Sequence, residues 1–234
     1  MGDFLQSLWT AGGLFSGADP RVWSIMQLSV TVSGVATLLA SALALPVAAW
    51  LALTSFPGRG AVLAALNALM GLPSVVVGLL VYLLLSRAGP LGSAGILFSP
   101  PAMVIAQTLL VMPLIAALAR QTLEDALTEY GPYLASLNAG KAASMGTLLF
   151  EARFSLATAV LAGFARAAAE VGAVLIVGGN IDGVTRVMTT AIALETSKGD
   201  LPLALGLGLL LMTMVLAVNV AAHGIHVYAL RRHG

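Results

Sequence analysis

Four long intervals of this chain contain no Lys, Arg, Asp or Glu, and they limit what the chain can fold into. Three of them separate Arg21, Arg59, Arg87 and Arg120 from one another, and the fourth covers residues 201–230. Each is longer than the roughly 20 apolar residues that a helix needs to cross a hydrocarbon core about 30 Å thick. Only 9% of the 234 residues are charged, which leaves too little polar surface for a soluble domain. The sequence therefore predicts an all-α polytopic membrane protein.

These intervals predict about five transmembrane helices within a single membrane domain, residues 1–234. Trp23 and Trp50 lie near the two ends of the first span, and Trp rings prefer the interface between lipid and water. No Lys or Arg precedes Arg21, so we expect the first span to be retained and not removed as a signal peptide. The expected spans cover residues 24–53, 61–86, 102–119, 154–177 and 202–228.

The distribution of basic residues predicts the orientation in the membrane. Five spans place the two termini on opposite sides, and cytoplasmic loops usually carry more Lys and Arg. One set of loops holds six basic residues and the other holds four. We therefore expect the N-terminus outside, the C-terminus in the cytoplasm, the loop 120–153 inside and the loop 178–200 outside. The larger set is Arg59, Arg120, Lys141, Arg153, Arg231 and Arg232, and the smaller set is Arg21, Arg87, Arg186 and Lys198.

The segment 120–153 is the longest polar stretch of the chain, although a connection between two spans needs only a few residues. Its interior, ASLNAGKAASMG (residues 135–146), consists mainly of small residues. Two interpretations remain open for it. The segment is either a solvated amphipathic hairpin or a docking element, because small residues allow the surface of another protein to approach closely.

The flanking segments are more distinctive. They are GLPSVVVGLLVYLLLSRAGPLG (residues 71–92) and the run from Glu151 to Asp200, which ends in TRVMTTAIALETSKGD. Together with a small-residue loop between the third and fourth of five spans, they resemble the permease subunits of binding-protein-dependent (type I) ABC importers. Within that superfamily the resemblance is to the tungstate transporter permeases, and it covers the chain from about Val22 onward.

In this family the loop after the third span carries a Glu-Ala-Ala, three residues, Gly pattern and forms a short helix seated in a cleft of the ATPase. The best register here places Pro132, Tyr133 and Leu134 on the Glu-Ala-Ala positions and Asn138 on the Gly position, so the sequence departs from the pattern. The resemblance nevertheless implies an ATPase-coupling loop formed by Tyr133, Leu134, Ala135, Ser136, Leu137, Asn138, Ala139, Gly140 and Lys141.

The resemblance also implies a fold, a function and partners. The fold is that of type I importer permeases, with a cytoplasmic coupling helix between helices 3 and 4. The function is tungstate import across the cytoplasmic membrane of a prokaryote by alternating access, with molybdate or another oxyanion such as sulfate as the alternative. The implied partners are a second copy of the chain, two ABC ATPase subunits, an extracytoplasmic tungstate-binding protein and membrane lipid. ATP and Mg²⁺ are then bound by the ATPase, so the chain is not an enzyme.

The residues agree that this chain binds neither a cofactor nor nucleic acid. A phosphate-binding loop needs G-x-x-x-x-G-K followed by Ser or Thr, whereas Gly140–Lys141 is followed by Ala142 and has Ala135 at the first Gly position. The absence of cysteine excludes disulfides and cysteine-ligated metals. A net charge of +1 provides no polybasic field for nucleic acid. His223 and His226 lack a neighbouring carboxylate and are expected to be interfacial, not metal ligands.

Two pairs of residues within the expected spans are candidates for lining the translocation pathway. Arg166 and Glu170 are four residues apart, which would place them on one face of a helix. Arg166 either attracts the oxyanion or forms a structural ion pair, and we favour the ion pair because Glu170 would cancel the charge. Pro73 and Ser74 indicate either an interrupted helix beside the pathway or close packing between helices.

The external loop supplies two positive charges, at Arg186 and Lys198, and two hydroxyl groups, at Thr189 and Thr190. The resemblance implies that this region faces the binding protein, and an interfacial helix with basic ends that reach toward water is the alternative. A secondary transporter would need an inverted repeat and ion-coupling groups, and neither is evident. A membrane-embedded enzyme would need a polar catalytic constellation, which is also not evident.

Overall fold

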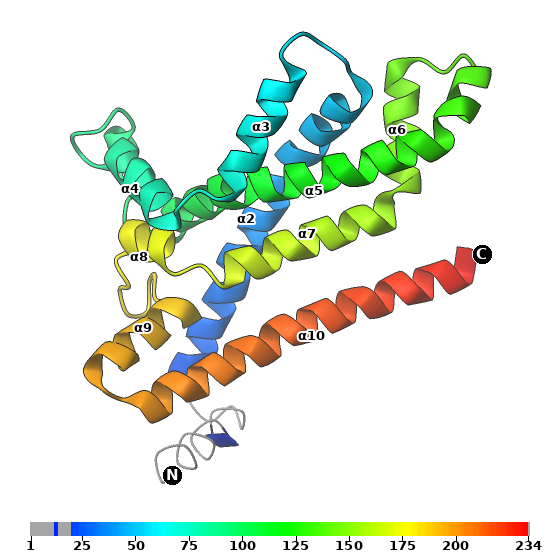
Figure 1. Ribbon diagram of the computed structural model, residues 1–234. Coiled ribbons are helices and arrows are strands. Elements are labelled where there is room, and N and C mark those ends of the chain that lie inside the picture. The colour runs from blue at the N-terminus through cyan, green and yellow to red at the C-terminus, as the bar shows by residue number, and fades with distance from the viewer. Residues whose placement is uncertain (1–11, 14–19, 234) are drawn as a thin grey trace. The chain divides into compact units, whose positions relative to one another are not determined.

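The computed structural model describes residues 12–13 and 20–233, and within the last helix it describes no side chain beyond Ala221. Over these residues the chain is helical and contains no strand, which confirms the predicted all-α class (Figure 1). The elements are α2 (Pro20–Leu53), α3 (Arg59–Met70), α4 (Ser74–Leu85), the 3₁₀ turn η1 (Gly92–Ala94), α5 (Pro100–Ser136), α6 (Lys141–Glu151), α7 (Arg153–Ala168), α8 (Gly172–Gly178), α9 (Met188–Lys198) and α10 (Leu201–His233).

Three of the described helices are long and apolar enough to cross a membrane: α2, α5 and the part of α10 from Leu201 to Ala221. Two pairs of shorter helices, α3 with α4 and α6 with α7, pass the same test together, but each pair is bent at a short break. The described chain therefore has three spans, or up to five if each bent pair counts as one span. The upper number agrees with the five spans expected from the charge-free intervals.

Helix α5 differs most from its expected boundaries. The sequence predicts a third span that ends at residue 119, followed by a polar loop, but the helix continues without a break to Ser136. The first charged residues end the apolar stretch and not the helix, because Leu, Glu, Gln and Arg are good helix formers. A break also divides the expected fourth span, 154–177, into α7 and α8.

The chain divides into two compact units, and we describe each by itself. Unit 1 contains residues 1–35, 73–107 and 168–234, and unit 2 contains residues 36–72 and 108–167.

Two apolar clusters form the core of unit 1. In the larger one, α4 and α8 pack on the first turns of α5, through buried residues that include Val81, Met103 and Val177. In the smaller one, α9 packs on α10 through Met188 and Leu207. These clusters fix the positions of the turns that follow α4 and α8.

Small residues allow the helices of unit 2 to approach one another closely. Ala36, Ala40, Ala44 and Ala48 are fully buried and recur every fourth residue, which places them on one face of α2. Ala40 and Ala44 pack in one cluster with Val111, Ile115 and Ala116 of α5, and Ala48 belongs to a second cluster with residues of α5, α6 and α7. Such stripes of small side chains are typical of helix contacts in membranes.

Candidate functional site

The segment 120–151 forms a helical hairpin within unit 2, made from the last turns of α5, a turn at residues 137–140 and α6 (Figure 1). We refer to residues 120–151 as the hairpin. It contains the predicted coupling loop, whose residues lie at the end of α5, in the turn and at the start of α6. The shape matches the amphipathic hairpin considered from the sequence. The resemblance implies a short helix in the coupling segment, whereas residues 133–136 continue α5 and α6 begins only at Lys141, so the coupling role of these residues stays a prediction.

The hairpin turn is a helix C-terminal cap that closes on Asn138. The backbone N–H of Asn138 donates to the carbonyl of Ala135 at 3.0 Å, and that of Ala139 donates to the carbonyl of Leu134 at 3.1 Å. Asn138 has a φ of 55°, in the left-handed region that Gly and Asn adopt most readily. Asn138 stands on the Gly position of the family pattern, so the departure in sequence preserves the backbone geometry that such a turn requires.

One face of the hairpin is anchored and the other is exposed. Leu134 and Leu148 are buried, with relative exposures of 6% and 1%, and pack in one cluster with residues of α2 and α7. Tyr133, Leu137 and Phe150 expose 62%, 59% and 62% of their surface. These large apolar side chains lie on a segment that also carries the charged residues Glu129, Lys141 and Glu151. They define a candidate surface for a protein partner.

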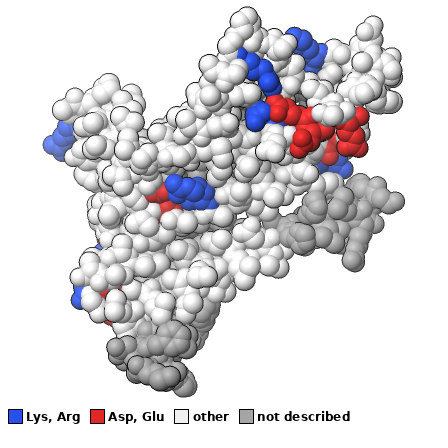
Figure 2. Space-filling model, viewed as in Figure 1, with Lys and Arg blue, Asp and Glu red and all other residues white. Residues whose placement is uncertain are grey.

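A three-residue charge cluster lies where α5 enters the hairpin. The two carboxylate oxygens of Glu124 pair separately with Arg59 of α3 and Arg120 of α5. Arg59 also donates through Nε and a terminal nitrogen to the carbonyl of Leu51, at 3.1 and 3.0 Å. This arrangement satisfies a carbonyl at the C-terminus of α2 and connects three helices. Figure 2 shows acidic and basic side chains gathered in this part of unit 2.

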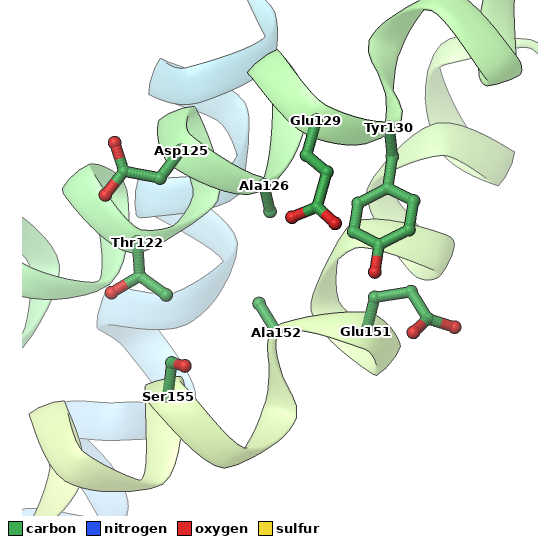
Figure 3. Close-up of a pocket in the computed structure, with 8 residues that line it drawn as sticks. All are labelled: Thr122, Asp125, Ala126, Glu129, Tyr130, Glu151, Ala152 and Ser155. Atoms are coloured by element: carbon green, nitrogen blue, oxygen red, sulfur yellow. The ribbon is translucent and has the colours of Figure 1, made fainter.

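Beside the hairpin lies an acidic cavity of about 320 Å³, where α5 faces the junction of α6 and α7 (Figure 3). Asp125, Glu129 and Glu151 line it, together with the polar side chains of Thr122, Tyr130 and Ser155. None of the described His, Cys, Asp and Glu residues form a group of three or more that could hold a metal ion. Three carboxylates would also repel an oxyanion.

The acidic cavity was not predicted from the sequence. The spacing of Asp125 and Glu129 indicates that they share one face of a helix, but nothing local indicates that Glu151 joins them. It does so because the hairpin turns back toward α5.

The expectation that Arg166 and Glu170 share a helix face is wrong, because α7 ends at Ala168. Glu170 lies in the break before α8 and is 3% exposed. Its Oε1 accepts a hydrogen bond from the backbone N–H of Ala173 at 3.2 Å, and its backbone carbonyl accepts one from the Thr189 hydroxyl at 2.7 Å. The carboxylate therefore satisfies an otherwise unpaired N–H in the first turn of α8. Arg166 is half-buried near the end of α7.

The interruption expected at Pro73 and Ser74 is present, since Pro73 has an extended conformation and α4 begins at Ser74. Close packing accompanies it. A Cβ atom added to Gly172 would lie 3.0 Å from Ser74 Oγ, and one added to Gly78 would lie 2.7 Å from the Cα atom of Ala173. Both interpretations of this stretch thus have a structural counterpart within unit 1, and its place beside a pathway stays a prediction.

The four candidates in the loop 178–200, which is expected to be external, have different environments. Thr189 and Thr190 are buried, and their hydroxyls bond to the backbone at Glu170 and Val187. Arg186 is half-buried and pairs with Asp182 at 3.0 Å. Lys198 is exposed and pairs with Glu195 at 2.9 Å. The hydroxyls therefore hold the loop together, while contact with a binding protein stays a prediction for Arg186 and Lys198. The side chains of His223 and His226 lie outside the described residues.

No protein-family model matches the chain, but curated relatives do. The tungstate uptake system permease protein TupB of Peptoclostridium acidaminophilum is 42% identical over 207 residues, which cover 88% of this chain and 91% of that protein. The probable anion ABC transporter permease protein of Haloferax volcanii is 40% identical over 203 residues, covering 84% and 87%. The sulfate transport system permease protein CysW of a Synechocystis species is 29% identical over 209 residues, covering 86% and 76%.

The all-α membrane fold and these relatives together define the class of the protein: it is an integral membrane transport permease. The chain belongs to the family of ABC transporter permeases that includes the tungstate uptake permeases.

Proposed function

We propose that this chain is the transmembrane permease of an ABC importer for tungstate. The observation that carries the proposal is the identity of 42% with a tungstate uptake permease over almost the full length of both chains. Relatives named for molybdenum transport are 28–32% identical over shorter alignments. This difference favours tungstate, and molybdate or sulfate is the second candidate.

In this proposal two copies of the chain form the pathway, and two separate ATPase subunits bind from the cytoplasm. The hairpin supplies the docking surface, because its exposed Tyr133, Leu137 and Phe150 lie on a segment whose opposite face is anchored by Leu134 and Leu148. Because the anchored face belongs to the core of unit 2, a displacement of the hairpin by the ATPase is transmitted to the ends of α2 and α7. The ATP and Mg²⁺ are bound by the ATPase, and the chain itself performs no chemistry.

An extracytoplasmic binding protein delivers tungstate to the opposite side of the membrane. The N-terminus lies outside and the C-terminus inside in this arrangement, as the distribution of basic residues predicts. Binding of ATP closes the two ATPases, draws the hairpins together and opens the pathway outward. Hydrolysis resets the pathway inward.

The test is the ATPase activity of the chain purified with its candidate ATPase in lipid discs, with and without tungstate-loaded binding protein. The informative variant is Tyr133→Ala with Leu137→Ala, which removes two exposed side chains four residues apart. The matched control is Leu79→Ala with Leu83→Ala, which removes two exposed side chains with the same spacing from α4. Because a few apolar anchors carry most of the free energy of an interface, we expect stimulation to fall roughly tenfold or more in the hairpin variant only.

Two results would count against the proposal. If the wild-type chain associates with no ATPase, the importer function is wrong. If both double variants are stimulated like wild type, the hairpin is not the docking surface, although the importer function stands.

A further inference from the structure

Unit 1 contains a cavity of about 550 Å³ between the end of α4 and the turn that leads into α5. Its lining includes Tyr82, Ser86, Arg87, Gly92, Leu97 and Phe98. The lining therefore combines one guanidinium group and two hydroxyl groups with apolar side chains. No function discussed above uses it.

The charge of Arg87 distinguishes this cavity from two others. The cavity beside the hairpin is lined by three carboxylates. A cavity of about 310 Å³ at the start of α2 includes Arg186, but Asp182 already pairs with that guanidinium. No ion pair of Arg87 occurs among the described residues. Of the three cavities, this one alone carries a positive charge that no described carboxylate neutralises.

The turn that encloses the cavity is held in place. Cβ atoms added to Gly89 and Gly92 would lie 2.0 Å from the Leu83 carbonyl oxygen and 2.3 Å from that of Ser86, so the backbone is wound too tightly for any other residue. On the far side, the backbone N–H of Phe98 donates to the Val177 carbonyl at 3.0 Å. A cavity with fixed walls loses little conformational entropy when it binds a ligand.

The aromatic and hydroxyl groups complete the cavity. The rings of Tyr82 and Phe98 meet edge to face with centroids 6.1 Å apart, and Leu85 at their side is 4% exposed. The Tyr82 hydroxyl has no hydrogen-bond partner among the described residues, so it is a second donor. The Ser86 hydroxyl donates to the Leu83 carbonyl at 3.1 Å and would have to rotate to reach a ligand.

We propose that this cavity binds a tetrahedral oxyanion through the Arg87 guanidinium and the Tyr82 hydroxyl. A guanidinium presents parallel N–H donors that match two oxygens of such an anion, and Arg87 is exposed, so the anion can reach it from solvent. The anion has two possible sources with the same chemistry: free tungstate or the phosphate of a lipid headgroup. The tungstate source rests on the proposed function and makes the cavity a waypoint for the anion.

The experiment uses the full-length chain alone in phosphatidylcholine discs. Sodium tungstate is titrated by equilibrium dialysis with elemental analysis, and phosphatidylglycerol added to parallel discs is counted by native mass spectrometry. Arg87→Gln removes the cation. Arg21→Gln is the control, because Arg21 is exposed, also belongs to unit 1 and does not line the cavity.

We expect Arg87→Gln to bind at least one of the two probes about tenfold more weakly than wild type, while Arg21→Gln binds both as wild type does. Loss confined to tungstate identifies the free oxyanion, and loss confined to phosphatidylglycerol identifies the lipid. Tyr82→Phe keeps the ring and removes the hydroxyl, so its weaker binding tests the site even if Arg87→Gln fails to fold. The proposal is overturned if the wild type binds neither probe. It is also overturned if Arg87→Gln and Tyr82→Phe bind both probes as tightly as the wild type does.

This result is separable from the proposed function, because no ATPase or binding protein is present. A chain that binds the oxyanion at Arg87 but couples to no ATPase would contradict the importer and leave the cavity intact. A chain that couples to the ATPase but binds neither probe would contradict the cavity proposal and leave the importer function intact.

Discussion

Asn138 shows how a residue other than Gly can adopt the left-handed backbone of a helix C-terminal cap. It occupies the Gly position of the coupling pattern and adopts a left-handed φ of 55°. Asn is the residue that replaces Gly there at the lowest cost, because its short polar side chain tolerates this region. Phe98 also has a positive φ, of 60°, but it is held by its hydrogen bond to Val177 and its contact with the Tyr82 ring.

The first prediction concerns the hairpin turn. Asn138→Gly should match or exceed the stability of the wild type, whereas Asn138→Val should destabilise it by about 1–2 kcal/mol, because a β-branched residue is strained in this conformation. Thermal unfolding of the purified chain in detergent measures both. Equal stabilities for Gly and Val would show that residue 138 does not keep its left-handed backbone in the protein.

Two breaks between helices determine where the short helices of unit 1 begin. Pro73 precedes α4, and residues 169–171 separate α7 from α8. The two short helices that follow these breaks, α4 and α8, pack directly on each other in unit 1. Gly78 allows α4 to approach α8 closely, because its missing side chain leaves room for the backbone of Ala173. Interrupted helices of this kind are tolerated at membrane depth only where protein surrounds them.

The second prediction tests this contact. Gly78→Ala should destabilise the protein by about 1–3 kcal/mol, because the added methyl group forces α4 away from α8. Gly208→Ala is the control within α10: nothing lies within 4 Å of its added Cβ, and Ala favours a helix by about 1 kcal/mol over Gly. Chemical denaturation of both variants measures the difference. A Gly78→Ala variant as stable as Gly208→Ala would contradict the close packing.

For the whole molecule, the number of crossings decides which segments share a side of the membrane. If each bent pair crosses once, the turn after α4 and the loop before α10 lie on one side, and the hairpin lies on the other. The chain has no native cysteine, so a single introduced thiol reports its own position without interference.

The third prediction uses exposed serines in these segments: Ser93, Ser136 and Ser197. On intact cells, a membrane-impermeant maleimide should label Ser93→Cys and Ser197→Cys, and it should label Ser136→Cys only after permeabilisation. Labelling is read from the mass shift on a gel. If Ser197→Cys reacts from the same side as Ser136→Cys while Ser93→Cys reacts from the other, the pair α6 and α7 does not cross the membrane. If Ser93→Cys and Ser136→Cys react from the same side, α5 does not cross it.

The charge-free intervals and the polar stretch between them were enough to predict the membrane class, the approximate spans and the place of the hairpin. These features depend on local properties, since an apolar stretch of sufficient length must be a helix in lipid wherever its neighbours lie. The coupling role of residues 133–141 stays a prediction, which rests on the small residues and the spacing although Pro132 and Asn138 depart from the family pattern.

Which side chains meet could not be predicted from the sequence and is known from the packing of the helices. Tyr133 and Leu134 are adjacent in the sequence, but one is exposed and the other is buried against distant helices. Glu170 was expected on the helix of Arg166, but it lies beyond the end of α7 and bonds to the first turn of α8. Such outcomes depend on contacts between residues far apart in the chain, and the free energy of those contacts overrides the periodicity that a sequence displays.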